Sequence, residues 1–111
     1  MTDIKALVQI ACKAIDDKKG IDIKVLNIEG LSPMADYFVI ASATNVNQVQ
    51  AISNEIDALL SKENIHFKQI EGYDTANWIL MDYGDFIVHI FTTESREYYN
   101  LERIWRDAKV E

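Results

Sequence analysis

Apolar residues recur every three or four positions in three stretches of the chain, which is the spacing of one face of an α-helix. The first stretch ends at Gly20, a residue favoured just after a helix C-terminus. The second begins after Thr44 and Asn45, either of which can cap a helix N-terminus, and the third covers about residues 95–108. The apolar stripes are Ile4, Leu7, Val8, Ala11 and Ile15, then Val46, Val49, Ile52, Ile56, Leu59 and Leu60, and lastly Tyr98, Leu101, Trp105 and Ala108. The pattern predicts three helices.

Five shorter apolar segments predict strands, at about residues 23–28, 37–41, 66–70, 78–81 and 86–91. The second segment is apolar on both faces, which is typical of a central strand. The strand–helix–strand order over residues 37–70 favours a right-handed crossover with parallel pairing of its two strands. The element order αββαβββα therefore predicts an α/β fold, with a single domain over residues 1–111 in which helices flank a mixed five-stranded sheet.

The last two strands are expected to form a hairpin with two different faces. A turn around residues 82–85 places Trp78 opposite His89 and Asp82 opposite Asp85, all on one side of the sheet. The other side pairs Ile79 with Val88 and Met81 with Phe86, and it is predicted to be core because it is wholly apolar.

Two interpretations of the mixed side of this hairpin stay open. An exposed Trp78 beside acidic residues is typical of an interface anchor that faces a basic partner. Alternatively, Trp78 is core beneath a helix, and Asp82 and Asp85 are turn residues that bond the local backbone.

The net charge of the chain limits the kinds of macromolecule that it is expected to bind. The chain has 18 acidic residues against 11 Lys and Arg, a formal net charge of −7. Such acidity argues against a protein that grips DNA or RNA backbones over a broad surface, and it suits a basic partner or simply solubility. The last helix alone has a modest cationic stripe, which either complements the helix dipole or makes a local RNA contact. The stripe consists of Arg96, Arg103, Arg106 and Lys109.

The sequence contains few residues in arrangements typical of metal binding or catalysis. Cys12 is the one cysteine, so the chain can form neither an internal disulfide nor a thiolate metal cluster. The two histidines, His66 and His89, lack metal-ligand spacing, and a metal site of His89 with Asp82 and Asp85 would have to span the length of the hairpin. There is no Gly-rich phosphate loop and no strand with carboxylates at alternate positions. We expect no catalytic residues, no metal and no cofactor.

No membrane segment is expected either. The longest apolar run, residues 37–41, is far shorter than the roughly 20 residues that span a bilayer. The start of the chain lacks the basic segment and long apolar run of a signal peptide, so a cytoplasmic protein is predicted.

Several blocks of sequence resemble, in order and spacing, those of one protein family. They are DYFVIAS at residues 36–42, the segment 45–52 with Gln48 and Val49, Glu71-Gly72, the hairpin 78–91 and the segment 96–105. Together they resemble the ribosomal silencing factor family, also called Iojap-like, over essentially the whole chain. Many members carry an arginine near the start of the second helix, where this chain reads Asn45-Val46-Asn47-Gln48, so contacts of that arginine do not carry over.

The resemblance implies an α/β fold with a nucleotidyltransferase-like core and a non-enzymatic role. It implies a translational repressor that binds the large ribosomal subunit through its fourteenth protein, a small basic protein, and blocks joining of the small subunit when nutrients run short. A homodimer in the free state and a minor rRNA contact are also implied. The alternative from another class is a small nucleotide-binding or nucleotidyltransferase-like enzyme, against which the missing carboxylate pair counts. A weaker third possibility is an adaptor dimer.

The residues that carry the resemblance lie in the hairpin and the last helix. The partner-binding residues expected from it are Trp78, Asp82, Gly84, Asp85, His89, Tyr98 and Tyr99. Leu101 and Trp105 are expected in the core.

Overall fold

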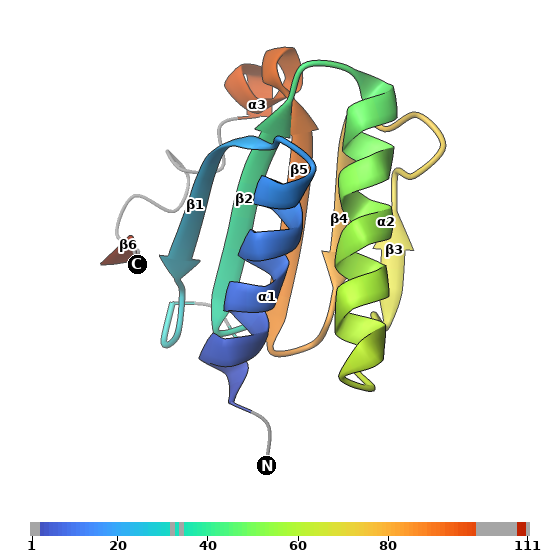
Figure 1. Ribbon diagram of the computed structural model, residues 1–111. Coiled ribbons are helices and arrows are strands. Elements are labelled where there is room, and N and C mark those ends of the chain that lie inside the picture. The colour runs from blue at the N-terminus through green and yellow to red at the C-terminus, as the bar shows by residue number, and fades with distance from the viewer. Residues whose placement is uncertain (1–2, 32, 34, 100–108, 111) are drawn as a thin grey trace.

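A computed structural model describes residues 3–31, 33, 35–99 and 109–110 (Figure 1). Its elements are α1 (Ile4–Asp17), β1 (Ile21–Asn27), β2 (Tyr37–Ala43), α2 (Val46–Lys62), β3 (Gln69–Glu71), β4 (Trp78–Asp82), β5 (Phe86–Thr92), α3 (Thr93–Tyr99) and β6 (Lys109–Val110). The predicted α/β fold is confirmed, since all five expected strands and the first two helices are present. A sixth strand of two residues, β6, joins the sheet in addition.

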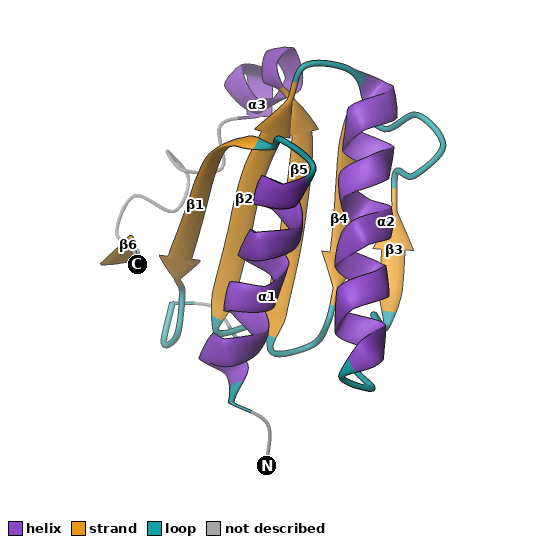
Figure 2. Ribbon diagram, viewed as in Figure 1, coloured by secondary structure: helices purple, strands orange, loops and turns teal. Residues whose placement is uncertain are grey.

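The strands form one mixed sheet in the order β3-β4-β5-β2-β1-β6. β2 and β5 are parallel, and the other neighbouring pairs are antiparallel. Figure 2 shows α1 and α2 lying side by side on one face of the sheet, while α3 sits at one end of β2 and β5. β2 and β5 occupy the centre because they are the most apolar strands, and all seven residues of β2 are buried.

Polar caps define where α1 and α2 begin. Asp3 precedes α1 and its side chain accepts a hydrogen bond from the Lys5 backbone N–H, while Asn45 does the same for Gln48 at the start of α2. The Gln48 side chain then links two turns. Its oxygen accepts from the backbone N–H of Thr44, and its amide nitrogen donates to the carbonyls of residues 18 and 19. The loop that ends α1 is thereby joined to the start of α2.

Two details of the predicted sheet are wrong. The strand near residue 70 does not pair with β2. β3 instead pairs antiparallel with β4 at the edge of the sheet, and the parallel partner of β2 is β5. The physical reason is burial, because β3 is short and largely exposed, whereas β5 is apolar on both faces and can fill a central position.

The hairpin register is the second correction. Trp78 faces Phe91, Leu80 faces His89 and Asp82 faces Ile87, a shift of two residues from the expected pairing. The cause is the loop, which consists of residues 84–85 and is closed by a 3.0 Å bond from Tyr83 N–H to the Phe86 carbonyl. Gly84 takes a φ of +89° at the first loop position, as type II′ hairpin turns require. Asp82 and Asp85 therefore do not oppose each other.

A shift of two keeps every paired side chain on its predicted face, since the side-chain period of a strand is two. The apolar side of the hairpin is core, as expected, and packs against α1 and α2. The opposite side, which we call the far face, carries a second apolar cluster. Its buried members are Leu26, Ile28, Ala35, Phe38, Ile40, Ile87 and Phe91, with Trp78 and Leu80 packed at its margin.

The last predicted helix is described in part. α3 begins at Thr93, two residues before the expected start, and its described portion ends at Tyr99. The expected core residues Leu101 and Trp105, and the basic Arg103 and Arg106, lie outside the described residues. Among the described helices, none has the length and apolar composition needed to cross a bilayer.

Candidate functional site

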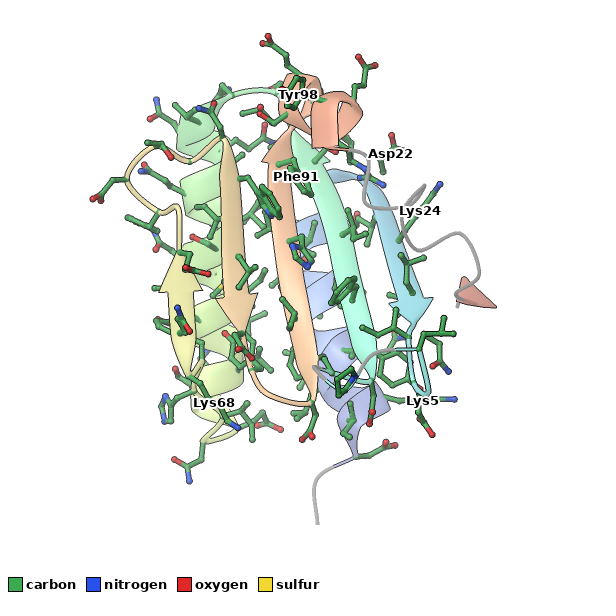
Figure 3. All side chains as sticks on the ribbon, turned by 180° about the vertical axis from the view of Figure 1, so that it is seen from behind. Lys5, Asp22, Lys24, Lys68, Phe91 and Tyr98 are labelled. Atoms are coloured by element: carbon green, nitrogen blue, oxygen red, sulfur yellow. The ribbon has the colours of Figure 1, made fainter. Side chains whose placement is uncertain are left out.

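The sequence-predicted site residues of the hairpin lie at its two ends. Trp78 begins β4 and Asp82 ends it, so about 13 Å of strand separates them. Figure 3, which looks onto the far face, shows Phe91 and Tyr98 toward one end of the sheet and Lys68 at the other. Trp78 pairs with Phe91 and belongs to the first end, while Gly84 lies against the Lys68 side chain at the second.

At the first end, Trp78 is held in one orientation by its neighbours on the far face. Its indole N–H donates to Nδ1 of His89 at 3.1 Å, and its ring stacks on Phe91 with the centroids 5.0 Å apart. Phe38 meets the His89 ring edge to face at 4.7 Å. Because α1 and α2 cover the other side of the sheet, Trp78 is not core beneath either of them, and it remains half-buried.

His89 supports Trp78 from within the sheet. Only 4% of His89 is exposed, and this burial lowers its pKa to about 4, so the ring is neutral at neutral pH. An indole N–H can only donate, so Nδ1 must be the acceptor and the ring proton resides on Nε2. Nε2 is buried and has no hydrogen-bond partner in the described structure. His89 is thus packed with Trp78 and does not present a nitrogen at the surface.

A shallow groove lies beside Trp78, where β3 meets β4. It has a volume of about 250 Å³ and is lined by Glu71, Gly72, Trp78 and Leu80. Gly72 allows the two strands to approach closely, because a Cβ at this position would lie 2.1 Å from the Trp78 carbonyl oxygen. Sequence reasoning missed this groove as a site. Its one signal was the Glu71-Gly72 block of the family resemblance.

At the second end, Asp82 is a turn residue. Its carboxylate accepts a 2.8 Å hydrogen bond from the Gly84 N–H, as one of the two interpretations proposed. Asp85 is exposed and lines a hollow of about 480 Å³ together with Asp3, Glu29, Asp36 and the basic Lys5. Four carboxylates thus outnumber one ammonium around this hollow.

α3 places its side chains at the Trp78 end of the sheet. Tyr98 is 82% exposed, whereas the side chain of Tyr99 lies outside the described residues. Arg96 points inward instead of forming a surface stripe, and it donates to the Asp22 carbonyl and, at 3.0 Å, to the Ser42 hydroxyl. Its guanidinium joins α3 to the ends of β1 and β2.

The described residues offer little for metal or nucleophile chemistry. Within the described ranges, no group of three or more His, Cys, Asp or Glu side chains is arranged to hold a metal ion. Burial raises the pKa of the Cys12 thiol, which disfavours the reactive thiolate. What the described residues do build is an aromatic surface fixed at Trp78 and a groove beside it.

Comparison with known proteins shows which family the chain resembles. The family model described as "Ribosomal silencing factor during starvation" matches residues 1–111. Ribosomal silencing factor RsfS of Bacillus subtilis is 46% identical over 104 residues, which cover 94% of this chain and 88% of that protein. The chloroplastic protein Iojap of Zea mays is 35% identical over 86% of this chain and 42% of its own length.

Solved structures agree as well. A crystal structure of a protein from Chromobacterium violaceum superposes with a TM-score of 0.91 at 29% identity, covering 94% of this chain and 87% of that one. A protein from Bacillus halodurans gives a TM-score of 0.83 at 42% identity over 91% of this chain and 94% of its own. The family model spans the hairpin, the groove residues and α3, and the chain belongs to the ribosomal silencing factor family, whose members are ribosome-associated regulatory factors.

Proposed function

We propose that this chain represses translation in the cytoplasm by binding the large ribosomal subunit through its fourteenth protein and sterically blocking the joining of the small subunit. The observation that carries the proposal is the state of Trp78, which is half-buried and held by stacking and a hydrogen bond on a sheet face that α1 and α2 do not cover. An aromatic side chain already fixed at a surface loses little conformational freedom on binding, so it suits an interface anchor.

The proposed partner-binding set is Trp78, Asp82, Gly84, Asp85, His89, Tyr98 and Tyr99. Their surroundings suggest different roles. Trp78 and the 82% exposed Tyr98 are the contacting side chains, and the exposed Asp85 attracts a basic surface. Asp82 and Gly84 act by shaping the turn, and His89 acts by holding Trp78.

The net charge of −7 supports a basic protein as the main partner, with any rRNA contact kept minor. The repression is proposed to be steric, to require no catalytic residue, cofactor or metal, and to operate when nutrients are limiting. A homodimer of the free protein completes the proposal.

The direct test is a sucrose-gradient profile of purified ribosomal subunits, mixed at a Mg²⁺ concentration that joins them, with and without this protein. We expect the protein to co-sediment with the large subunit and the joined peak to shrink. If the protein stays at the top of the gradient and joining is unchanged, the proposed function is wrong.

Trp78→Ala tests the anchor in the same assay. Truncation removes the stacked indole from the far face, and we expect binding to the large subunit to weaken by at least about tenfold, as for a typical aromatic anchor. Val46→Ala is the matched control, because it trims an exposed apolar side chain from α2, on the opposite face of the sheet. Equal binding by both variants, with circular dichroism showing both folded, would contradict the assignment.

A further inference from the structure

We infer that the groove between β3 and β4 receives an arginine side chain from the basic partner, with the guanidinium lying against Trp78 and bonded to the Glu71 carboxylate. The inference rests on the proposed function for the existence of that partner. The identity of the occupant is argued from the side chains that line the groove and from its size.

Strand register brings the groove residues to one face. Glu71 on β3 lies directly opposite Leu80 on β4, and Trp78 is two residues before Leu80, so all three side chains project on the far face. Glu71 stands at the exposed edge of the sheet, whereas Trp78 and Leu80 are half-buried. The groove therefore has apolar walls and a carboxylate at its rim.

The groove side chains offer hydrogen-bond acceptors to a ligand but no donors. The indole N–H of Trp78 is committed to Nδ1 of His89, so the aromatic wall has no donor left for a ligand. Glu71 supplies acceptors, and no basic side chain of the described residues forms an ion pair with it. A ligand that satisfies this groove must bring donors and positive charge.

Size and shape select among cations. A volume of about 250 Å³ fits one side chain and lies below the range usual for small-molecule sites. A guanidinium is planar, stacks on aromatic faces and can bond a carboxylate with two parallel N–H groups. An ammonium is a compact, strongly hydrated charge that lacks both geometries, so arginine is favoured over lysine.

His89 is the positioning residue of this arrangement. It is 4% exposed, and its Nε2 has no partner in the described part of the chain, so its presence in an apolar face costs stability. What it supplies is the acceptor that fixes the indole plane and removes the competing donor from the groove.

The first experiment uses the whole protein without ribosomes. The indole N–H resonance of Trp78, identified by its absence in Trp78→Phe, is followed while acetyl-Gly-Arg-Gly-amide or its lysine counterpart is added. We expect a saturable shift with the arginine peptide, a much smaller one with the lysine peptide, and loss of the difference in Glu71→Gln. Equal responses to the two peptides, or an unchanged response in Glu71→Gln, would overturn the inference.

The second experiment measures binding to purified large subunits. We expect Glu71→Gln to weaken binding about tenfold, as loss of a charge-assisted bond does. Glu63→Gln is the control, since it makes the same charge change at an exposed position at the end of α2. If wild type binds and the two variants bind alike, the arginine groove is wrong while the proposed function stands. If wild type does not bind, the proposed function fails and the peptide titration alone decides the groove.

The role of His89 is tested with two variants. His89→Asn can place an amide oxygen where Nδ1 lies, whereas His89→Phe keeps an aromatic ring without an acceptor. We expect His89→Phe to move the Trp78 indole N–H resonance and abolish the preference for arginine, and His89→Asn to restore both in part. Preference for arginine that persists in His89→Phe would exclude the positioning role.

Discussion

His89 is a neutral imidazole packed among aromatic rings on the far face, and its protonation makes the stability of the fold depend on pH. Its pKa is lowered from 6.5 to about 4 because burial disfavours the imidazolium, which the unfolded chain forms freely. Between these two values the unfolded state binds more protons than the folded state. As far as His89 is concerned, the free energy of unfolding is therefore highest above pH 6.5 and decreases as the pH falls toward 4.

We expect the free energy of unfolding to fall by up to about 3 kcal/mol more in wild type than in His89→Phe over this window. Urea unfolding of both proteins at several pH values measures the difference. The carboxylates titrate in both proteins and cancel in the comparison. Parallel pH profiles would show that His89 does not carry the effect.

Gly72 is a second residue whose identity is set by its surroundings. It has a φ of +80°, and an added Cβ would lie 2.1 Å from the Trp78 carbonyl oxygen. We expect Gly72→Ala to destabilise the fold by about 3 kcal/mol, measured as a lower melting temperature, since both backbone strain and a backbone clash are introduced.

Gly30→Ala separates these two causes. Gly30 has nearly the same φ, +83°, but a Cβ there would meet no atom of the described residues within 4 Å. We expect its cost to be about 1 kcal/mol, the strain alone. Similar melting temperatures for the two variants would mean that the clash with β4 relaxes freely.

At the scale of elements, side-chain faces were predictable and register was not. Any even shift of the hairpin leaves Trp78 and His89 on one face, so the alternation of residues suffices to assign it. Register depends on which two residues form the loop. Gly84, with its positive φ, is the first residue of the observed loop 84–85, whereas a pairing of Asp82 with Asp85 would place Gly84 second. The groove escaped prediction because the expected strand ended at residue 70 and was paired with β2, whereas Glu71 belongs to β3 and lies opposite Leu80 of β4.

Gln48 shows how a single amide joins two elements. It accepts from Thr44 and donates to the carbonyls of Lys18 and Lys19. We expect Gln48→Glu to lower the free energy of unfolding by about 1–2 kcal/mol, because a carboxylate can accept but cannot donate. Asn47→Ala, a change at the neighbouring exposed position, is the control in the same chemical denaturation series. A Gln48→Glu curve that overlays wild type would show that the link contributes nothing.

At the scale of the whole molecule, charge is expected to govern the rate of encounter with a basic partner. Asp85 lines a hollow in which its carboxylate and those of Asp3, Glu29 and Asp36 accompany a single cation, Lys5. We expect Asp85→Lys to slow association with the large subunit several-fold at low ionic strength, and the difference to shrink as salt is added.

Stopped-flow or surface-based kinetics at several salt concentrations measure this effect. Asp16→Lys makes the same charge change at an exposed position near the C-terminus of α1, at the opposite end of the sheet, and should slow association less. A deficit in Asp85→Lys that is independent of salt would point to a lost contact instead of weaker steering.

The parallel pair at the centre of the sheet also bears on how the protein is made. β2 and β5 pair along their whole length although partners such as Tyr37 and Phe86 lie roughly 50 residues apart. During synthesis, β2 must wait without its parallel neighbour until nearly the entire described chain has left the ribosome. Until β5 has emerged, the seven residues of β2, which are all buried in the folded protein, are available to other hydrophobic surfaces, including chaperones. A ribosomal silencing factor built this way completes its core only after β5 has been synthesised.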